Sequence, residues 1–432
     1  MLLKFIVFSS WKRKLLLCRK HRRYALPSFH SESLHAAVTL PINDFFKREF
    51  DLEVNVLRSY YQDEGTRLYE LEALENEPIE NEDFVWFDPH SIQSLVEIHP
   101  NERKEMLDWL SKGGSRNFAW FQLGWRQRME AWVEQKLPYR PIAFEQIRSW
   151  ERSALFKIKT TKDNYYFKAV PDVFSHEPSI HNYIAEQHPS YVPEVIALDS
   201  EKKWYIMGEL QGDLLGKSTN ISHWENALHR MVTIQKGSLI HSDKLQKLGC
   251  PVRPVIEALN NHLEESLGEL ASNNNISLEK HTVLKKSIPF MLSLARKLHE
   301  SRLPISLDHG DLFGGNIIVQ QEQPVIYDWS DSSLTHPFLS VIVLLEEVSE
   351  YFSEEESQKL LDSYLEEWKM FDTRSRLYEE FRLVRALAPM YYLALYQRFI
   401  FPAFEDNFDK QQIIDQYVEK WLSEINKMDL CY

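Results

Sequence analysis

The sequence predicts an α+β fold in which a strand-rich N-terminal half precedes a mainly helical C-terminal half. Short runs of β-branched and aromatic residues recur up to residue 207, with turn residues between them. From Leu214 onward apolar residues recur at helical spacing, except in a strand-rich island at residues 305–328. The length of 432 residues leaves room for two or three domains with cores of their own.

Residues 1–100 predict a small α+β module, and residues 101–137 a helical linker. A helix is expected over residues 42–50, capped at Asn43 or Asp44, and another after Asp88. The linker is expected to be helical over residues 102–110 and 120–137, with a break at Gly113-Gly114-Ser115. The strands expected in the module cover residues 5–8, 15–18, 54–61, 66–74 and 84–87.

Pro138 and Pro141 open a second unit, which divides into a segment of strands at residues 138–212 and a helical segment at 213–432. One helix interrupts the strands and covers residues 177–187. The strands expected here cover residues 144–149, 154–160, 165–170, 195–198 and 204–207.

Glycine is scarce: 13 of the 432 residues, about 3%, are glycine, whereas the usual share is about 7%. The motif G-x-G-x-x-G does not occur, which excludes a conventional Rossmann dinucleotide site and the glycine loop of a typical protein kinase. Three of the glycines, Gly310, Gly314 and Gly315, fall within six residues. A tight turn is therefore expected in that window.

The formal charge of −14 argues against nucleic acid as a partner. Cys18, Cys250 and Cys431 are odd in number, are far apart and form no C-x-x-C motif, which fits a reducing, cytoplasmic environment without disulfides or a zinc site. Since no stretch approaches 18 apolar residues, we expect no membrane partner.

The window around residue 310 carries the residue types that phosphoryl transfer needs. His309, Asp311 and Asn316 share one loop, and Asp328 follows an apolar strand twelve residues after Asn316. A carboxylate can accept or orient the proton of a substrate hydroxyl, while an amide oxygen and a second carboxylate can hold magnesium against nucleotide phosphates. Because Asp and Asn are also common turn residues, it is their spacing that favours a catalytic loop.

This pattern resembles the aminoglycoside phosphotransferase and choline kinase-like family, which has the bilobal protein-kinase-like fold. His309-Gly-Asp311-x-x-x-x-Asn316 matches the family's catalytic loop, and the segment from Asp328 to Pro337 looks like its metal-binding segment. The resemblance implies Asp311 as catalytic base or orienting group, His309 as a brace of the loop, and Asn316 and Asp328 as Mg²⁺ ligands. Family members often carry an Asp where this chain has Ser340, so a supporting carboxylate is expected to be missing.

The resemblance also implies nucleotide-binding residues in a small lobe at residues 138–212. Lys168, a lone cation in an apolar strand, is expected to contact phosphates and to pair with Glu177 or, as an alternative, Glu186. The loop from Ser149 to Ser153 is expected to cover the phosphates, with Ser153 offering a hydroxyl or an amide. The expected hinge that meets adenine through backbone groups consists of Met207, Gly208, Glu209 and Leu210.

Two other motifs are weaker. Residues 212–218 are one residue short of a P-loop, which needs its full length to aim consecutive amides at phosphates. His176 and His181 are five residues apart with Pro178 between them, unlike the four-residue spacing of a zinc helix.

Residues 42–58 resemble the helix, loop and strand of a Nudix domain, but Arg48-Glu49 is the clear remnant of its acidic motif. The resemblance implies a degenerate module without hydrolytic activity.

We therefore expect an ATP- and Mg²⁺-dependent phosphotransferase acting on a hydroxyl group of a small molecule, with ATP between the two lobes of residues 138–432. The alternative is a catalytically silent, kinase-like nucleotide-binding or regulatory protein. A protein kinase is disfavoured because D-F-G and A-P-E are absent from the expected places.

Overall fold

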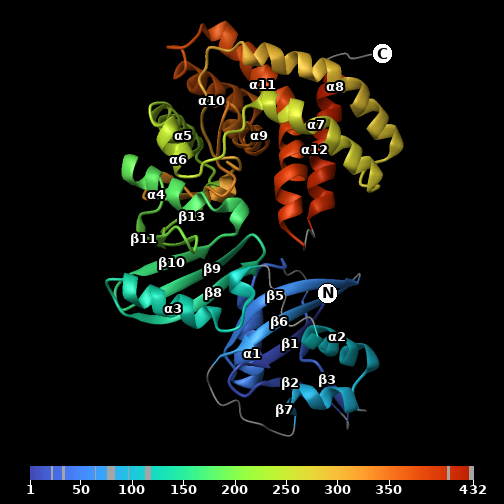
Figure 1. Ribbon diagram of the computed structural model, residues 1–432. Helices are drawn as coiled ribbons and strands as arrows, with labels where there is room; N and C mark the ends of the chain where they lie inside the picture. The colour runs from blue at the N-terminus through green and yellow to red at the C-terminus, as the bar shows by residue number, and fades with distance from the viewer. Residues whose placement is uncertain are drawn as a thin grey trace. The chain divides into compact units, whose positions relative to one another are not determined.

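The computed structural model describes residues 1–20, 23–31, 35–63, 65–74, 83–95, 97–111, 118–405 and 409–427. The chain forms two compact units, Met1–Pro171 with Glu201–Met207, and Asp172–Ser200 with Gly208–Tyr432. It is a mixture of helices and sheets, as the sequence predicts (Figure 1). The two units cut across the four expected segments, whose boundaries remain predictions.

The first unit begins with a seven-stranded mixed sheet that has the order β3-β2-β1-β6-β5, with β4 on β1 and β7 on β2. Its centre is the parallel pair β1–β6, in register from Leu2 opposite Thr66 to Ser9 opposite Ala73. The strands are β1 Leu2–Ser9, β2 Lys14–Lys20, β3 Arg23–Ala25, β4 Ser28–His30, β5 Val54–Asp63, β6 Thr66–Ala73 and β7 Phe84–Phe87.

Successive side chains of a strand point to opposite faces of the sheet. Both faces of this sheet carry buried apolar side chains. On one face Phe5 packs with Phe46 of helix α1 (Leu40–Phe50). On the other face Ile6 packs with Met106 of helix α2 (Pro100–Ser111). Helix α2 therefore belongs to the core of the N-terminal sheet, where the sequence predicts a linker.

A second sheet of the first unit contains β12, β10, β9 and β8 in that order. The rings of Trp125 and Trp132 on helix α3 (Trp125–Lys136) pack against Phe167 and Trp204 of this sheet. These tryptophans are thus packing anchors. The strands are β8 Pro141–Trp150, β9 Ser153–Thr160, β10 Asn164–Ala169 and β12 Trp204–Gly208.

The two sheets of the first unit are joined by buried hydrogen bonds. The Gln146 side chain accepts from the Val56 backbone N–H at 2.8 Å and donates to the Val56 carbonyl at 2.7 Å. The Ser149 hydroxyl donates to the Leu57 carbonyl at 2.7 Å. Buried polar groups paired in this way fix the position of β8 against β5, so the two sheets of the first unit form one body.

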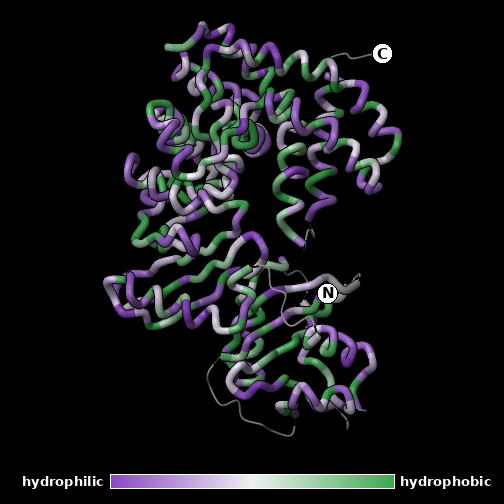
Figure 2. Tube along the Cα trace, in the orientation of Figure 1, coloured by the Kyte–Doolittle hydropathy of each residue, from purple (hydrophilic) through white to green (hydrophobic). Residues whose placement is uncertain are grey.

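The second unit is mainly helical and has one large apolar core. Helix α12 shows how its helices contribute, with Ile414, Val418, Trp421 and Ile425 buried at helical spacing. Hydrophobic and hydrophilic stretches alternate along the helices of this unit (Figure 2). The helices are α4 Glu177–Gln187, α5 Ile221–Leu239, α6 Ser242–Lys247, α7 Val255–Ser272, α8 Leu278–His299, α9 Ile342–Tyr351, α10 Glu354–Glu366, α11 Arg374–Leu395 and α12 Lys410–Lys427. The strands are β11 Val195–Asp199, β13 Asp213–Leu214, β14 Ser306–Asp308, β15 Ile317–Gln320, β16 Gln323–Ile326 and β17 Ser333–Thr335.

Several expected elements need correction. Helix α1 begins at Leu40 with Thr39 as its N-cap, because Pro41 suits the first turn of a helix, so the caps at Asn43 and Asp44 are wrong. The helix expected after Asp88 is the short 3-10 helix η1 (Pro89–Ser94). The helix expected from residue 120 begins at Trp125, after Gly124 with its φ of 73°. The expected break at residues 113–115 lies outside the described residues.

Among the described helices, none combines the length and the apolar character that crossing a bilayer requires.

Candidate active site

Strand pairing brings the two loops of the candidate site together within the second unit. The first loop runs from the end of β14 to the start of β15, and the second from the end of β16 to the start of β17. Asp308 at the end of β14 pairs with Ser333 at the start of β17. Ile317 at the start of β15 pairs with Ile326 at the end of β16. Both ends of one loop are thus anchored beside the ends of the other.

His309 connects the two loops and is fully buried. Its Nε2 lies 3.0 Å from the carbonyl oxygen of Tyr327, and its ring packs on Trp329 at 4.6 Å between centroids. Since a carbonyl can only accept, Nε2 carries the proton, and Nδ1 accepts from the Asp311 backbone N–H at 3.3 Å. This is the neutral tautomer with both nitrogens engaged, so neither is left for proton transfer to a substrate.

Asn316 holds Asp311 in place. Its side-chain Nδ2 donates to the Asp311 carbonyl at 2.9 Å and to Asp311 Oδ2 at 3.0 Å. Asn316 is nearly buried, whereas Asp311 is exposed. The arrangement presents a carboxylate of fixed orientation to solvent.

Asn316 and Asp328 offer the oxygen donors that Mg²⁺ prefers. Both hydrogen bonds to Asp311 come from Asn316 Nδ2, and Asn316 Oδ1 accepts no hydrogen bond from the described residues. This oxygen is therefore available to a metal ion. Asp328 has a φ of 66°, a conformation uncommon for a side-chain-bearing residue, and its Oδ1 accepts from the Ser330 hydroxyl at 3.0 Å. In the described part of the chain no three His, Cys, Asp or Glu side chains gather to hold a metal alone. A magnesium ion here would need further oxygens from phosphates and water, which is its usual habit.

Glycine is required in the first loop for reasons of space. Gly310 has a φ of 81°, and a Cβ added there would lie 2.3 Å from the Asp331 carbonyl oxygen. A Cβ at Gly314 would lie 2.6 Å from the backbone nitrogen of Gly216. The Gly314 N–H donates to Glu347 Oε2 at 2.6 Å, and this hydrogen bond opposes the rise in the Glu347 pKa that burial causes.

Asp308 is a site residue that the sequence analysis did not single out. It is fully buried, and burial raises the pKa of its carboxyl to about 7. The Ser340 hydroxyl donates to Asp308 Oδ1 and accepts from the His309 backbone N–H at 3.0 Å. A carboxyl therefore does lie beside residue 340, and it comes from the residue before the H-x-D motif. The position of Asp308 directly before the H-x-D motif is the sequence feature that could have identified it.

The short P-loop-like segment at 212–218 has a packing role. Its 3-10 helix η4 (Leu215–Lys217) packs against η5 (Gly314–Asn316), and β13 pairs with β15. A Cβ at Gly212 would lie 2.0 Å from the Val319 carbonyl oxygen. Its glycines therefore serve close backbone packing.

In the first unit, Lys168 lies on β10 opposite Leu155 and is 8% exposed. This burial excludes an outward-pointing surface lysine. Ser153 is nearly buried, and its hydroxyl accepts from Trp150 Nε1 at 3.0 Å. The connection between β8 and β9 is a two-residue turn, shorter than the expected loop from Ser149 to Ser153, because both ends stay paired in the sheet. Its role over the phosphates stays a prediction.

The remaining expected nucleotide residues lie on other elements. Glu177 is the first residue of α4 and is fully buried, whereas Glu186 on the same helix accepts from Asn182 at 2.8 Å. Met207 and Gly208 end β12, and Glu209 and Leu210 follow it. The Gly208 N–H donates to the Glu194 carbonyl at 3.0 Å, so that amide is already engaged.

Comparison with known proteins gives a family and a fold. The phosphotransferase enzyme family, APH, matches residues 143–380. Choline kinase from Cryptosporidium parvum Iowa II has 15% identity and a TM-score of 0.53, covering 70% of this chain and 96% of its own. A mutant aminoglycoside 2′-phosphotransferase-IIIa, solved as its GDP complex, has 14% identity and a TM-score of 0.50, covering 70% of this chain and 97% of its own. No curated protein sequence matches the chain. The family match begins after the seven-stranded sheet, so the Nudix resemblance of that module stays a hypothesis.

Proposed function

The chain belongs to the phosphotransferase enzyme family, and from this premise we propose that it transfers the γ-phosphate of ATP to a hydroxyl group of a small molecule. The observation that carries the proposal is the pair of hydrogen bonds from Asn316 to Asp311, which orient an exposed carboxylate. His309, in the same loop, bonds to Tyr327, the residue before Asp328. Phosphoryl transfer depends mainly on such positioning, because the protein has little covalent chemistry to perform.

In the proposed reaction, Asp311 accepts or orients the proton of the acceptor hydroxyl. The acceptor oxygen forms a bond to the γ-phosphorus while the bond from that phosphorus to the β–γ bridging oxygen breaks, and ADP leaves. Asp311 suits this role because it is exposed to the acceptor, and because Asn316 fixes the orientation of Oδ2.

Asn316 and Asp328 are proposed to hold Mg²⁺ through Asn316 Oδ1 and the Asp328 carboxylate. The ion would neutralise charge on the nucleotide phosphates. His309 keeps the segments of both ligands together through its hydrogen bond to Tyr327, the residue before Asp328.

Lys168 is proposed to contact the phosphates, since a buried ammonium group demands a partner of opposite charge. The pairing with Glu177 stays a prediction. The backbone of Met207, Glu209 and Leu210 is proposed to meet the adenine. Gly208 would contribute its carbonyl, because its N–H is engaged. The Ser153 hydroxyl already accepts from Trp150, so Ser153 would contribute through its remaining donor capacity.

The test is acceptor-stimulated ADP release with Mg²⁺ across sugars, amino-alcohols, nucleosides and aminoglycosides. ATP is compared with GTP, because one structural relative was solved with GDP. Asp311→Ala and Asp328→Ala should each abolish turnover, while Asp243→Ala, at an exposed position on α6, should not. Full activity of either site variant would overturn the proposal. Mg²⁺-dependent ATP binding without transfer to any acceptor would favour a silent binding protein.

A further inference from the structure

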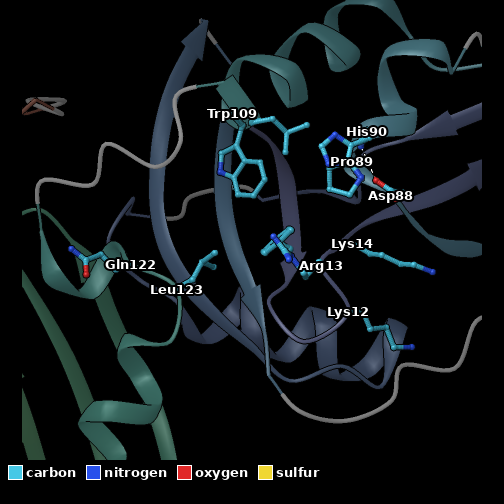
Figure 3. Close-up of a pocket in the computed structure, with 11 residues that line it drawn as sticks. Lys12, Arg13, Lys14, Asp88, Pro89, His90, Trp109, Gln122 and Leu123 are labelled. Carbon is cyan, nitrogen blue, oxygen red and sulfur yellow. Dashed lines mark hydrogen bonds between the residues drawn. The ribbon is translucent and has the colours of Figure 1, made fainter.

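A pocket of about 870 Å³ opens on the α2 side of the seven-stranded sheet (Figure 3). It is lined by the turn between β1 and β2, by residues 88–90, by the end of α2 and by residues 122–123. All of these precede residue 143, where the family match begins, so the proposed function makes no use of the pocket. Its volume lies within the range of about 300–1,000 Å³ that small-molecule sites occupy.

The pocket is rich in uncompensated positive charge. Lys12, Arg13 and Lys14 all line it, and none of the three side chains forms an ion pair in the described part of the chain. The acid at the pocket, Asp88, turns Oδ1 toward the His90 backbone N–H at 2.8 Å and so caps η1. Three consecutive cations that form no ion pair with a described residue are notable in a chain whose formal charge is −14.

The backbone of the turn positions these cations at some cost. Arg13 has a φ of 53°, in the left-handed region that side-chain-bearing residues seldom adopt. The antiparallel pairing of Phe8 with Leu15 and of Ser9 with Lys14 holds the turn, and the Lys12 N–H donates to the Ser9 hydroxyl at 3.1 Å. Arg13 is thus fixed at the backbone, while its guanidinium pairs with no acidic side chain of the residues that the structure describes.

An aromatic wall accompanies the charge. Trp109 lines the pocket from α2 and packs on Phe8 with 5.4 Å between ring centroids. Figure 3 shows Trp109, His90 and Arg13 arranged around the same space, with Leu123 beside them. In the same view the side chains of Lys12 and Lys14 extend away from the ring, so the cation beside it is the Arg13 guanidinium. A ring surface next to a guanidinium group suits a ligand that is planar at one end and anionic at the other.

We propose that this pocket binds a phosphorylated small molecule with a planar ring, of mononucleotide size. Arg13 contacts its phosphate, Lys12 and Lys14 add positive charge at the same turn, and Trp109 stacks on its ring. An inorganic anion alone would leave the aromatic wall and most of the volume unused, whereas an uncharged ring would leave three cations without a partner.

The test is calorimetric titration of the full-length protein with AMP, pyrophosphate and adenosine as probes, without added metal. AMP should bind at one site and more tightly than pyrophosphate or adenosine. Its affinity should fall as the salt concentration is raised. Arg13→Asn removes the cation while keeping a residue that tolerates the left-handed backbone, and should weaken both AMP and pyrophosphate about tenfold. Trp109→Leu should weaken AMP about fivefold and leave pyrophosphate unchanged.

Two controls decide where the probe binds. Lys104→Gln removes an exposed α2 cation that does not line the pocket, and should change nothing. Lys168→Ala, in the proposed ATP site, should also leave this binding intact. The proposal is overturned if AMP does not bind saturably, if Lys104→Gln weakens it as much as Arg13→Asn, or if Lys168→Ala alone abolishes it. Should Trp109→Leu prove unstable, the surface variant Arg13→Asn still decides.

Discussion

Asn316 Nδ2 donates to both oxygens that Asp311 turns toward it, the backbone carbonyl at 2.9 Å and Oδ2 at 3.0 Å. One amide therefore fixes the carboxylate and, through the carbonyl, the loop that carries it. The Oδ1 atom of Asn316 accepts no hydrogen bond from the described residues and so remains available to a metal ion. This single side chain joins the two proposed halves of the chemistry, acceptor activation and metal binding.

Asn316→Ala should lower kcat by about 100-fold or more, because it removes both the orientation of Asp311 and a metal ligand. Asn316→Asp keeps an oxygen ligand but places a second carboxylate beside Asp311, which should raise the apparent pKa in the acidic limb of the kcat profile. The measurement is kcat against pH with an accepted acceptor. Unchanged kcat in Asn316→Ala would remove Asn316 from the site.

Gly310→Ala should destabilise the protein by about 3 kcal/mol or more, since the new Cβ would meet the Asp331 carbonyl and the φ of 81° disfavours alanine. Gly268, within α7, has open space around it, so Gly268→Ala should stabilise by about 1 kcal/mol. Denaturant unfolding measures both. Equal stability of the two variants would contradict the geometry at Gly310.

Asp308 should make stability depend on pH. Its folded-state pKa of about 7 lies above the ordinary value of 3.8, so the folded protein retains a proton that the unfolded chain releases. This contribution is complete below about pH 4 and is lost as the pH rises through about 7. Relative to Asp308→Asn, which cannot titrate, the wild type should therefore lose stability between pH 4 and 7. Parallel curves of thermal midpoint against pH would show that Asp308 does not titrate in this range.

Ser340→Ala should lower the free energy of unfolding by about 1–3 kcal/mol, because it deprives the buried Asp308 carboxyl and the His309 N–H of a partner. Ser272→Ala is a matched change at an exposed helical hydroxyl and should stay within about 0.5 kcal/mol of wild type. If the two variants are equally stable, the Ser340 bridge contributes nothing.

Local sequence pattern was sufficient for most elements and for the catalytic motif. Helix α4 begins at Glu177 and ends at Gln187 as expected, since Pro178 in its first turn and core spacing of Ile180 and Ile184 mark it clearly. The strands β1, β2, β5, β6 and β7 of the N-terminal sheet were also expected, whereas the three-residue strands β3 and β4 were missed. The family match confirms the resemblance that the spacing of Asp311 and Asn316 suggested.

Features set by distant contacts were beyond the sequence. The bond from Ser340 to Asp308 joins residues 32 apart, and no local pattern reveals it. The connection after Trp150 is shorter than the loop expected at residues 149–153, because pairing of Trp150 with Ser153 extends both strands by a residue. The role of α2 in the N-terminal core depends on Met106 sharing a buried cluster with Ile6, a residue one hundred positions earlier in the chain.

The His309 bridge has a consequence for amide hydrogen exchange. The backbone N–H groups of Asp311, Asn316 and Tyr327 all donate within the two loops, to His309 Nδ1, the Phe313 carbonyl and the Asn316 carbonyl. Because His309 Nε2 also donates to Tyr327, neither loop can open without breaking bonds of the other. The three amides should therefore exchange with deuterium through one shared opening event of equal free energy. His309→Ala should separate them, giving each loop its own exchange rate.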